Sequence, residues 1–217
     1  MAGFFITFEG VEGCGKSTQV TLLAQALRAR DYEVVSTREP GGTPIGQTLR
    51  RILLESASPS LARGTELLLL LADRAQHVHD VIAPGLQDGK VVISDRFLDS
   101  TTAYQGYGRG IDREFLDRLN VFACDGYLPA LTILLDLPVE HGLERAAQRR
   151  GTTAAADHFE AESLAFHERV RAGFLAVARA EPKRVCVFDA RRSIAELHQE
   201  ILTLVCSRLA HEMGNDL

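Results

Sequence analysis

The sequence predicts an α/β fold in which a five-stranded, mostly parallel sheet carries helices on both faces. Two observations support this class. Short apolar, β-rich runs alternate with longer segments whose apolar residues recur at helical spacing. A glycine-rich segment, Gly10–Ser17, lies between the first expected strand and the first expected helix. With 217 residues, the chain is long enough for a single domain with a sizeable core.

Five short apolar runs are typical of buried strands, and turn-forming or polar residues bound them. The first, Phe4–Phe8, ends at Glu9-Gly10, and the third, Val91–Ile93, stops at Ser94-Asp95. In chain order, the strands are expected at residues 4–8, 33–36, 91–93, 131–135 and 185–188.

Helical spacing of apolar residues fills most of the intervals between these strands. Helices are expected at residues 17–30, 45–55, 65–86, 139–148, 162–180 and 193–210. The helix at 65–86 is apolar nearly all round at its start, so we expect burial in the core or at a subunit contact. Pro40-Gly41-Gly42 predicts a turn, and Gly106, Gly108 and Gly110 predict a flexible loop.

Composition excludes several classes of protein. A net charge of -5 argues against a general nucleic-acid-binding surface. The four cysteines are widely spaced, which favours neither a disulfide framework nor a zinc site. The first residues lack the pattern of a signal peptide, and the longest apolar run, Leu67–Ala72, is far shorter than the ~20 residues of a membrane span. We therefore expect a cytoplasmic protein that binds neither nucleic acid nor membrane.

The segment Gly10–Ser17 matches G-x-x-x-x-G-K-[ST] in full. Its glycines allow backbone N–H groups to turn inward around phosphate oxygens, and the following helix N-terminus adds partial positive charge. Lys16 is suited to the β- and γ-phosphates of ATP, and the Ser17 hydroxyl to Mg²⁺. Glu12 either faces a substrate hydroxyl or a metal-bound water, or is a solvated side chain. The ATP-binding residues are therefore expected to be Gly10, Val11, Glu12, Gly13, Cys14, Gly15, Lys16, Ser17 and Thr18.

Charged residues at strand ends indicate what faces this loop. Asp95 closes an apolar strand, where it either holds the Mg²⁺ shell or caps the strand. Arg38 and Arg96 follow strands that are expected beside the first one, and Arg74 lies on a helix that looks buried. Such a cluster suits a second polyanion whose repulsion from ATP must be screened. The expected reaction is phosphoryl transfer to a nucleoside monophosphate, whose ionised oxygens need no general base.

Four segments of the chain resemble thymidylate kinase, from about Phe5 to about Phe188. They are Phe8-Glu9-Gly10 with Gly15-Lys16-Ser17-Thr18-Gln19, Thr37-Arg38-Glu39-Pro40-Gly41-Gly42-Thr43, Asp95-Arg96-Phe97 and Ala103-Tyr104-Gln105-Gly106. The resemblance implies a P-loop kinase fold over residues 1–217, with a LID flap at about 149–160, and a homodimer. It implies the reaction ATP + dTMP → ADP + dTDP with Mg²⁺.

The resemblance also implies roles for individual residues. Arg38 and Arg96 would grip the dTMP phosphate, Arg74 would bond thymine, and Glu12 would face the sugar 3′-hydroxyl. Tyr104 would occupy the place of a ribose 2′-hydroxyl. Ser100, Thr101 and Gln105 would line the thymidine pocket. Leu70 stands where the family often has a stacking aromatic residue, a role that Phe97 or another ring would then take.

The position of the catalytic arginine follows from the same resemblance. The variable positions Val11–Cys14 of the phosphate loop carry no basic residue, whereas Arg149 and Arg150 lead into the flap. This is similar to the type of thymidylate kinase in which the LID supplies the arginine. In the flap, His158 stands where relatives have arginine. Arg191, after the fifth strand, either covers adenine or belongs to a surface loop.

Two other functions remain open on the sequence. A deoxynucleoside kinase would phosphorylate a sugar hydroxyl and would need a base such as Glu39, although the adjacent Arg38 suits a phosphate acceptor better. An ATP-dependent regulatory module would bind ATP without releasing ADP in response to an acceptor. A GTPase switch is disfavoured because neither N-K-x-D nor D-x-x-G occurs. His77 and His79, two residues apart on one helix, point apart and are expected to be structural.

Overall fold

The computed structural model describes residues 3–54, 61–150 and 158–212, without the side chain of Arg150. Five parallel strands form one sheet in the order β2-β3-β1-β4-β5. The strands are β1 (Phe4–Glu9), β2 (Val34–Arg38), β3 (Val91–Asp95), β4 (Leu131–Asp136) and β5 (Val185–Asp189). All five expected strands are confirmed, and each extends one to two residues further at its carboxyl end than the apolar run alone indicated.

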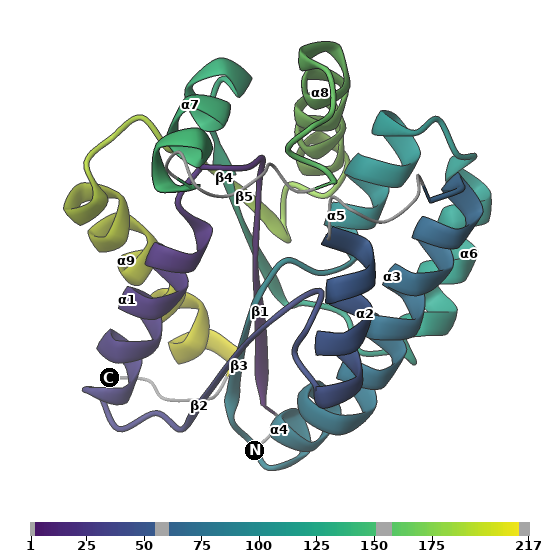
Figure 1. Ribbon diagram of the computed structural model, residues 1–217. Helices are drawn as coiled ribbons and strands as arrows, with labels where there is room; N and C mark the ends of the chain where they lie inside the picture. The colour runs from purple at the N-terminus through teal and green to yellow at the C-terminus, as the bar shows by residue number, and fades with distance from the viewer. Residues whose placement is uncertain (1–2, 55–60, 151–157, 213–217) are drawn as a thin grey trace.

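Helices cover both faces of the sheet (Figure 1). The longer ones are α1 (Lys16–Arg28), α2 (Pro44–Leu54), α3 (Arg63–His77), α6 (Arg113–Cys124), α7 (Val139–Arg150), α8 (Leu164–Ala180) and α9 (Ile194–Glu212). Helices α1 and α9 lie together on one side, and α2, α3 and α6 on the other. None of the helices in the described part of the chain is long and apolar enough to cross a membrane.

Alternation along the strands divides the core in two, because successive side chains of a strand point to opposite faces. Phe4 and Ile6 face the larger cluster, which includes side chains of α1, α8 and α9. Phe5 and Val92 face a smaller cluster with Phe97 and Cys124. The two apolar layers fix the sheet between the helices, so the carboxyl ends of the strands are rigid supports for side chains.

The expected helix at 65–86 is helical throughout but is not regular. It consists of α3, then the wider π-helical turn η1 (Val78–Ile82), then α4 (Ala83–Gln87). Only one stripe of its apolar start is buried: Leu67 and Leu71 pack against α6, whereas Leu68 is exposed. His77 is buried and His79 is exposed, so their rings point apart as expected.

Two expectations about the region after β3 were wrong. The stretch predicted as a flexible loop is largely helical: α5 (Leu98–Thr101) runs into η2 (Thr102–Gly108), and most of η2 is buried. Gly106 and Gly108 serve close packing, because a Cβ at Gly108 would lie 2.6 Å from the Phe166 ring. Helix α6 was not predicted at all, although Asp112 caps it by accepting from the Phe115 N–H.

Candidate active site

The phosphate loop connects the central strand β1 to α1, so it lies at the carboxyl edge of the sheet. Gly10, Gly13 and Gly15 have φ angles of 138°, 70° and 98°, which L side chains rarely adopt. Lys16 folds back over the loop, and its Nζ donates to the carbonyls of Gly10 and Val11 at 3.0 and 2.9 Å. The loop thus gathers an ammonium group and a helix N-terminus in one place, an arrangement that favours polyphosphate.

The parallel pairing of the strands brings a carboxylate, Asp95, and a guanidinium, Arg38, to the same edge of the sheet. In the register of the sheet, Asp95 of β3 is opposite Phe8 of β1 on one side and Arg38 of β2 on the other. Asp95 accepts a 2.5 Å hydrogen bond from the Ser17 hydroxyl. The two groups expected to bind the metal are therefore adjacent, and both offer the hard oxygen ligands that Mg²⁺ prefers.

Arg96 has a left-handed backbone, with φ of 74°, which is uncommon outside glycine. Its guanidinium reaches across the cleft to the Gly10 carbonyl at 3.1 Å and the Glu12 carboxylate at 3.0 Å. It also lies 5.1 Å above the centre of the Tyr104 ring. Burial by itself would lower the pKa of Arg96, but Tyr104 and the surrounding carboxylates raise it, so the side chain stays a cation.

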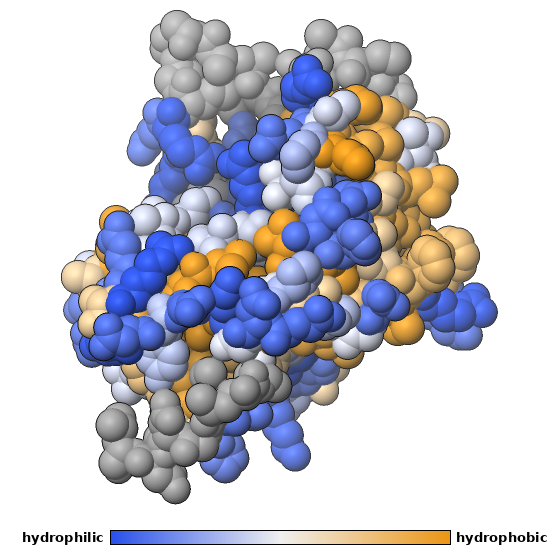
Figure 2. All heavy atoms as spheres, turned by 90° about the horizontal axis from the view of Figure 1, so that it is seen from below, coloured by the Kyte–Doolittle hydropathy of each residue, from blue (hydrophilic) through white to orange (hydrophobic). Residues whose placement is uncertain are grey.

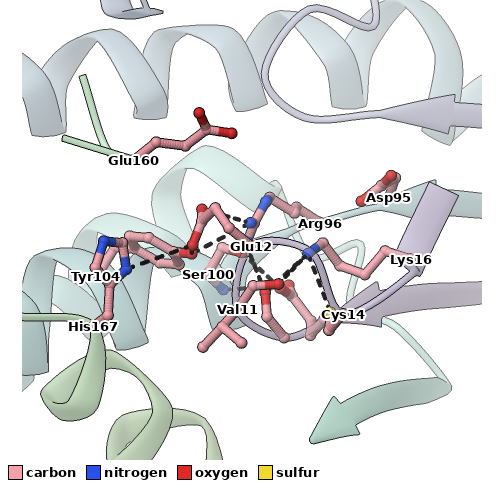
Figure 3. A network of polar contacts seen from close by, with 12 residues as sticks. Val11, Glu12, Cys14, Lys16, Asp95, Arg96, Ser100, Tyr104, Glu160 and His167 are labelled. Atoms are coloured by element: carbon pink, nitrogen blue, oxygen red, sulfur yellow. Dashed lines mark hydrogen bonds and ion pairs between the residues drawn. The ribbon is translucent and has the colours of Figure 1, made fainter. Parts of the chain in front are cut away.

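Glu12 is the point where these groups meet (Figure 3). Its two carboxylate oxygens each lie 2.6 Å from the Tyr104 hydroxyl, and Arg96 approaches Oε1. Burial would raise the pKa of Glu12, but Arg96, Lys16 and the Tyr104 hydrogen bond together lower it. Glu12 is thus an ordered, ionised acid inside the site, and the alternative of a solvated side chain is wrong.

Arg74 is buried, as expected, with a relative exposure of 2%. Its Nε donates to Glu39 at 3.0 Å, and one terminal nitrogen donates to Thr101 at 3.0 Å and Asn120 at 2.8 Å. The other oxygen of Glu39 lies 2.9 Å from Nδ1 of His77. Since both oxygens of Glu39 are engaged in holding neighbours, Glu39 is poorly suited to be the base of a sugar kinase.

One open cleft joins these groups. It brings together most of the side chains expected to bind substrates. These are Glu12, Gly13, Lys16, Ser17, Arg38, Leu70, Arg74, Asp95, Arg96, Ser100, Thr101, Tyr104, Gln105 and Arg149. Phe97 lines the same cleft below the Arg74 guanidinium, whose carbon lies 5.1 Å from the ring centre, so an aromatic ring is present despite Leu70.

Some expected residues have side chains that do not line the cleft. Within the phosphate loop, the side chains of Val11 and Cys14 are buried, and the Cys14 sulfur accepts a hydrogen bond from Lys16 at 3.5 Å. Thr18 is exposed on α1. Arg191 lies outside the cleft and forms an ion pair with Asp189 at the end of β5. The side chain of Arg150 and residues 151–157 of the LID segment lie outside the described residues.

Several residues in or near the cleft were missed. Glu160 and Phe159 close the flap side of the cleft, and Arg50, which donates to the Pro40 carbonyl at 2.8 Å, closes the other side. Glu66 was also missed: it is buried at the start of α3 and holds Gln105, Arg109 and His158. An acid placed just before the leucine run of α3 was the available signal. His158 thus has a carboxylate partner, Glu66, 2.9 Å away.

Comparisons with known proteins agree with this geometry. The profile of the thymidylate kinase family matches residues 8–201. Thymidylate kinase of Trichlorobacter lovleyi is 51% identical over 208 residues, which cover 95% of this chain and 98% of that protein. That of Solidesulfovibrio magneticus is 56% identical over 192 residues, covering 87% and 92%. The crystal structure of thymidylate kinase from Ehrlichia chaffeensis matches with a TM-score of 0.76 and 37% identity, over 94% of this chain and 99% of that one. The chain therefore belongs to the thymidylate kinase family, whose members use ATP to phosphorylate dTMP to dTDP.

Proposed function

We propose that this enzyme, in phosphorylating dTMP to dTDP, takes its catalytic arginine from Arg149 or Arg150 and not from the phosphate loop. The observation that carries the proposal is the position of Arg149, which lines the cleft although its side chain is 70% exposed and lies 3.6 Å from Glu160. Positions 11–14 of the loop offer no cation. An arginine held at the mouth is available to screen charge on the transferring phosphoryl group when the flap closes.

The acceptor half of the cleft is assigned by charge. The side chain of Arg38 makes no hydrogen bond or ion pair with the other described residues, so its guanidinium is available to the dTMP phosphate together with Arg96. Arg74, which is held by Glu39 and Asn120 and lines the cleft, would donate to thymine. Two arginines on an ionised acceptor make a general base unnecessary, because the attacking oxygen already carries charge.

The remaining polar residues of the cleft surround the sugar. Tyr104 presents its ring where a 2′-hydroxyl would stand, while Glu12, bonded to Tyr104, faces the 3′-hydroxyl. Ser100, Thr101 and Gln105 line the same wall of the cleft, so they complete the thymidine pocket.

Ser17 and Asp95 would hold Mg²⁺ at the phosphate loop. Their oxygens lie 2.5 Å apart, and the described residues offer no cluster of three or more His, Cys, Asp or Glu side chains as a metal cage. This fits Mg²⁺, which prefers one or two protein oxygens completed by water and phosphate. When bound, the ion would neutralise charge on the β- and γ-phosphates.

A homodimer is supported by an exposed apolar surface on α3 and α6. Leu68 is 63% exposed, Val121 67% and Phe122 82%, and Phe115 and Phe122 are seven residues apart on one face of α6. Figure 2 shows apolar side chains gathered on the side where Figure 1 has α6. A contiguous apolar surface of this kind marks a protein contact.

We also propose that residues 1–217 form one domain, because the sheet is continuous. The four cysteines are unpaired, which fits a protein that acts in the reducing cytoplasm.

The decisive experiment measures ADP release with ATP, Mg²⁺ and a panel of acceptors: dTMP, dUMP, dCMP, AMP and thymidine. We expect dTMP to be the preferred acceptor and thymidine to be inactive. Turnover of thymidine without dTMP would indicate a deoxynucleoside kinase, and ATP binding without acceptor-dependent ADP release would indicate a regulatory module.

Variants of Arg149 and Arg150 test whether the LID supplies the catalytic arginine. Arg149→Ala and Arg150→Ala are expected to lower kcat, together by about 10²-fold or more, with a smaller effect on dTMP affinity. Arg145→Ala is the matched control, because Arg145 lies on the same helix but donates to the Ala190 carbonyl instead of lining the cleft. Normal turnover by both variants would refute a LID arginine.

A further inference from the structure

His167 is a buried side chain that the functional assignment leaves unused. It lies on the first turn of α8, directly after the LID segment, and its relative exposure is 1%. Neither ring nitrogen has a hydrogen-bond partner among the described residues. Buried polar groups are nearly always satisfied, because an unmet donor or acceptor is costly. Two unsatisfied nitrogens next to Glu12, which itself lines the cleft, therefore point to a role that this state of the enzyme does not use.

The ring faces Glu12. Its Nδ1 lies 3.7 Å from Oε2 of Glu12, which is within ion-pair range but too long for a hydrogen bond (Figure 3). On its other side, Phe166 packs edge-on to the imidazole with ring centres 5.5 Å apart. Oε1 of Glu12, by contrast, is engaged by Arg96 at 3.0 Å. Apart from the Tyr104 hydroxyl, which contacts both oxygens, Glu12 therefore has Arg96 bonded to Oε1 and His167 beyond hydrogen-bond distance from Oε2.

We propose that His167 is a positioning residue, which holds Glu12 in place when the dTMP phosphate draws Arg96 away. The inference rests on the proposed function, in which Arg96 grips that phosphate. A guanidinium that turns toward a phosphate gives up its hydrogen bond to Glu12, and among the described side chains the Tyr104 hydroxyl is then the one remaining hydrogen-bond donor to this carboxylate. A movement of roughly 0.8 Å brings the Nδ1–H of His167 to ordinary hydrogen-bond distance from Oε2.

The position of the His167 ring depends on the chain that leads from the flap into α8. Ser163 caps α8 through the Phe166 N–H, and the His167 N–H donates to the Ser163 carbonyl at 3.2 Å, so the ring position depends on where α8 begins. Just before this helix, Phe159 packs edge-on against Tyr104, with centres 5.6 Å apart. The segment that closes the cleft and the donor that steadies Glu12 therefore belong to one continuous piece of chain.

The test compares three variants in the full-length enzyme by steady-state kinetics with ATP and Mg²⁺. His167→Phe keeps a planar ring of similar size but has no donor, and we expect kcat/KM for dTMP to fall by about tenfold, mainly through KM, with KM for ATP unchanged. His167→Gln restores an N–H donor and is expected to recover most of the loss. His198→Phe is the matched control: His198 also has an unpartnered ring nitrogen, but it lies on α9, which contributes nothing to the cleft.

A double-mutant cycle with Glu12→Gln decides whether His167 acts through Glu12. If it does, His167→Phe adds little to the loss already caused by Glu12→Gln, because the two residues form one unit. Full additivity, or equal losses in the Phe and Gln variants at unchanged melting temperature, would overturn the proposal. If His167→Phe does not fold, the cycle is run with His167→Leu, which also has no donor, and a Leu variant that matches the wild type in kcat/KM for dTMP would also overturn the proposal. Wild-type failure to use dTMP would instead overturn the proposed function.

Discussion

The Ser17 hydroxyl donates a 2.5 Å hydrogen bond to Oδ2 of Asp95 and so joins the first turn of α1 to the end of β3. The bond crosses from the phosphate loop to the neighbouring strand, and both partners line the cleft. It keeps two oxygen ligands together at the edge where parallel strands end, the part of an α/β fold that binds ligands.

Replacing Asp95 by Asn is expected to raise the Mg²⁺ concentration needed for half-maximal turnover and to lower kcat by about tenfold or more, since a carboxylate ligand is lost. A titration of activity against Mg²⁺ measures both effects. Asp88→Asn, an exposed acid paired with Lys90, serves as the control. An unaltered Mg²⁺ titration in the Asp95 variant would contradict the assignment, as would full activity in excess EDTA.

Tyr104 permits the hydroxyl and the ring to be tested separately. Tyr104→Phe removes the bonds to Glu12 but keeps the ring, so discrimination between dTMP and its ribose counterpart should persist while kcat/KM falls. Tyr104→Ala opens the space for a 2′-hydroxyl and should relax that discrimination. It should also cost about 3–5 kcal/mol of stability, because Phe159, Phe166 and Phe174 pack edge-on around the ring.

The selectivity ratio, measured as kcat/KM for the two acceptors, checks the Tyr104 assignment. Equal ratios in the wild type and the Ala variant would remove Tyr104 from the sugar site.

The raised pKa of the buried Glu9 predicts that the free energy of unfolding depends on pH. Burial, reinforced by Asp99, raises its pKa from 4.5 to about 8, although Ser100 and the Phe97 N–H donate to it. Between these values the folded chain keeps a proton that the unfolded chain releases, so the free energy of unfolding decreases as pH rises from 4.5 to about 8. Glu9→Gln, which stays neutral, is expected to flatten this decline.

Melting temperatures from pH 5 to pH 9 measure the Glu9 effect. Glu114→Gln, at an exposed acid on α6, is the control and should follow the wild-type curve. A Glu9→Gln curve parallel to the wild type would show that Glu9 titrates in its ordinary range.

Phe122 provides the test of the dimer. Its side chain is 82% exposed, so Phe122→Asp should hardly affect folding of the subunit, yet a charge there would oppose burial against a second copy. Light scattering after gel filtration should shift from the mass of two chains to that of one. Ile194→Asp, at an apolar residue on α9 that is 60% exposed, should leave the mass unchanged. A dimeric Phe122→Asp variant would place the interface elsewhere.

The sequence predicted the centre of the sheet well because β1, β3 and β4 are buried on both faces and therefore appear as nearly uninterrupted apolar runs. The phosphate loop was predictable for a related reason: its glycines and Lys16 must be consecutive to surround a phosphate. Helix α6 was missed because its exposed Phe115, Val121 and Phe122 obscure the amphipathic pattern, although Asp112 marks its start. The glycines of η2 were misread because both tight packing and flexibility favour glycine. At Gly108, the Phe166 ring, which is distant in sequence, shows that tight packing is the reason.

Long-range partners explain what remained hidden at the site. Arg74 was identified as buried, but its partners Glu39, Thr101 and Asn120 come from three different parts of the chain. Likewise, the partners of Glu66 follow only once α3, η2 and the flap have packed together. No local pattern specifies which of many charged residues will meet across a fold.

The widened turns of η2 impose a constraint on length. The Arg109 N–H donates to the Tyr104 carbonyl, five residues back, at 2.9 Å, so Tyr104 faces Glu12 while Arg109 reaches Glu66 one wide turn later. Deleting one residue between them would close the wide turn into an ordinary α-helical turn, but only three residues would then remain to make the contacts of Gln105, Gly106, Tyr107 and Gly108. Homologues can therefore exchange residues in this stretch more easily than they can gain or lose one, and an alignment gap between positions 104 and 109 would signal a rebuilt site.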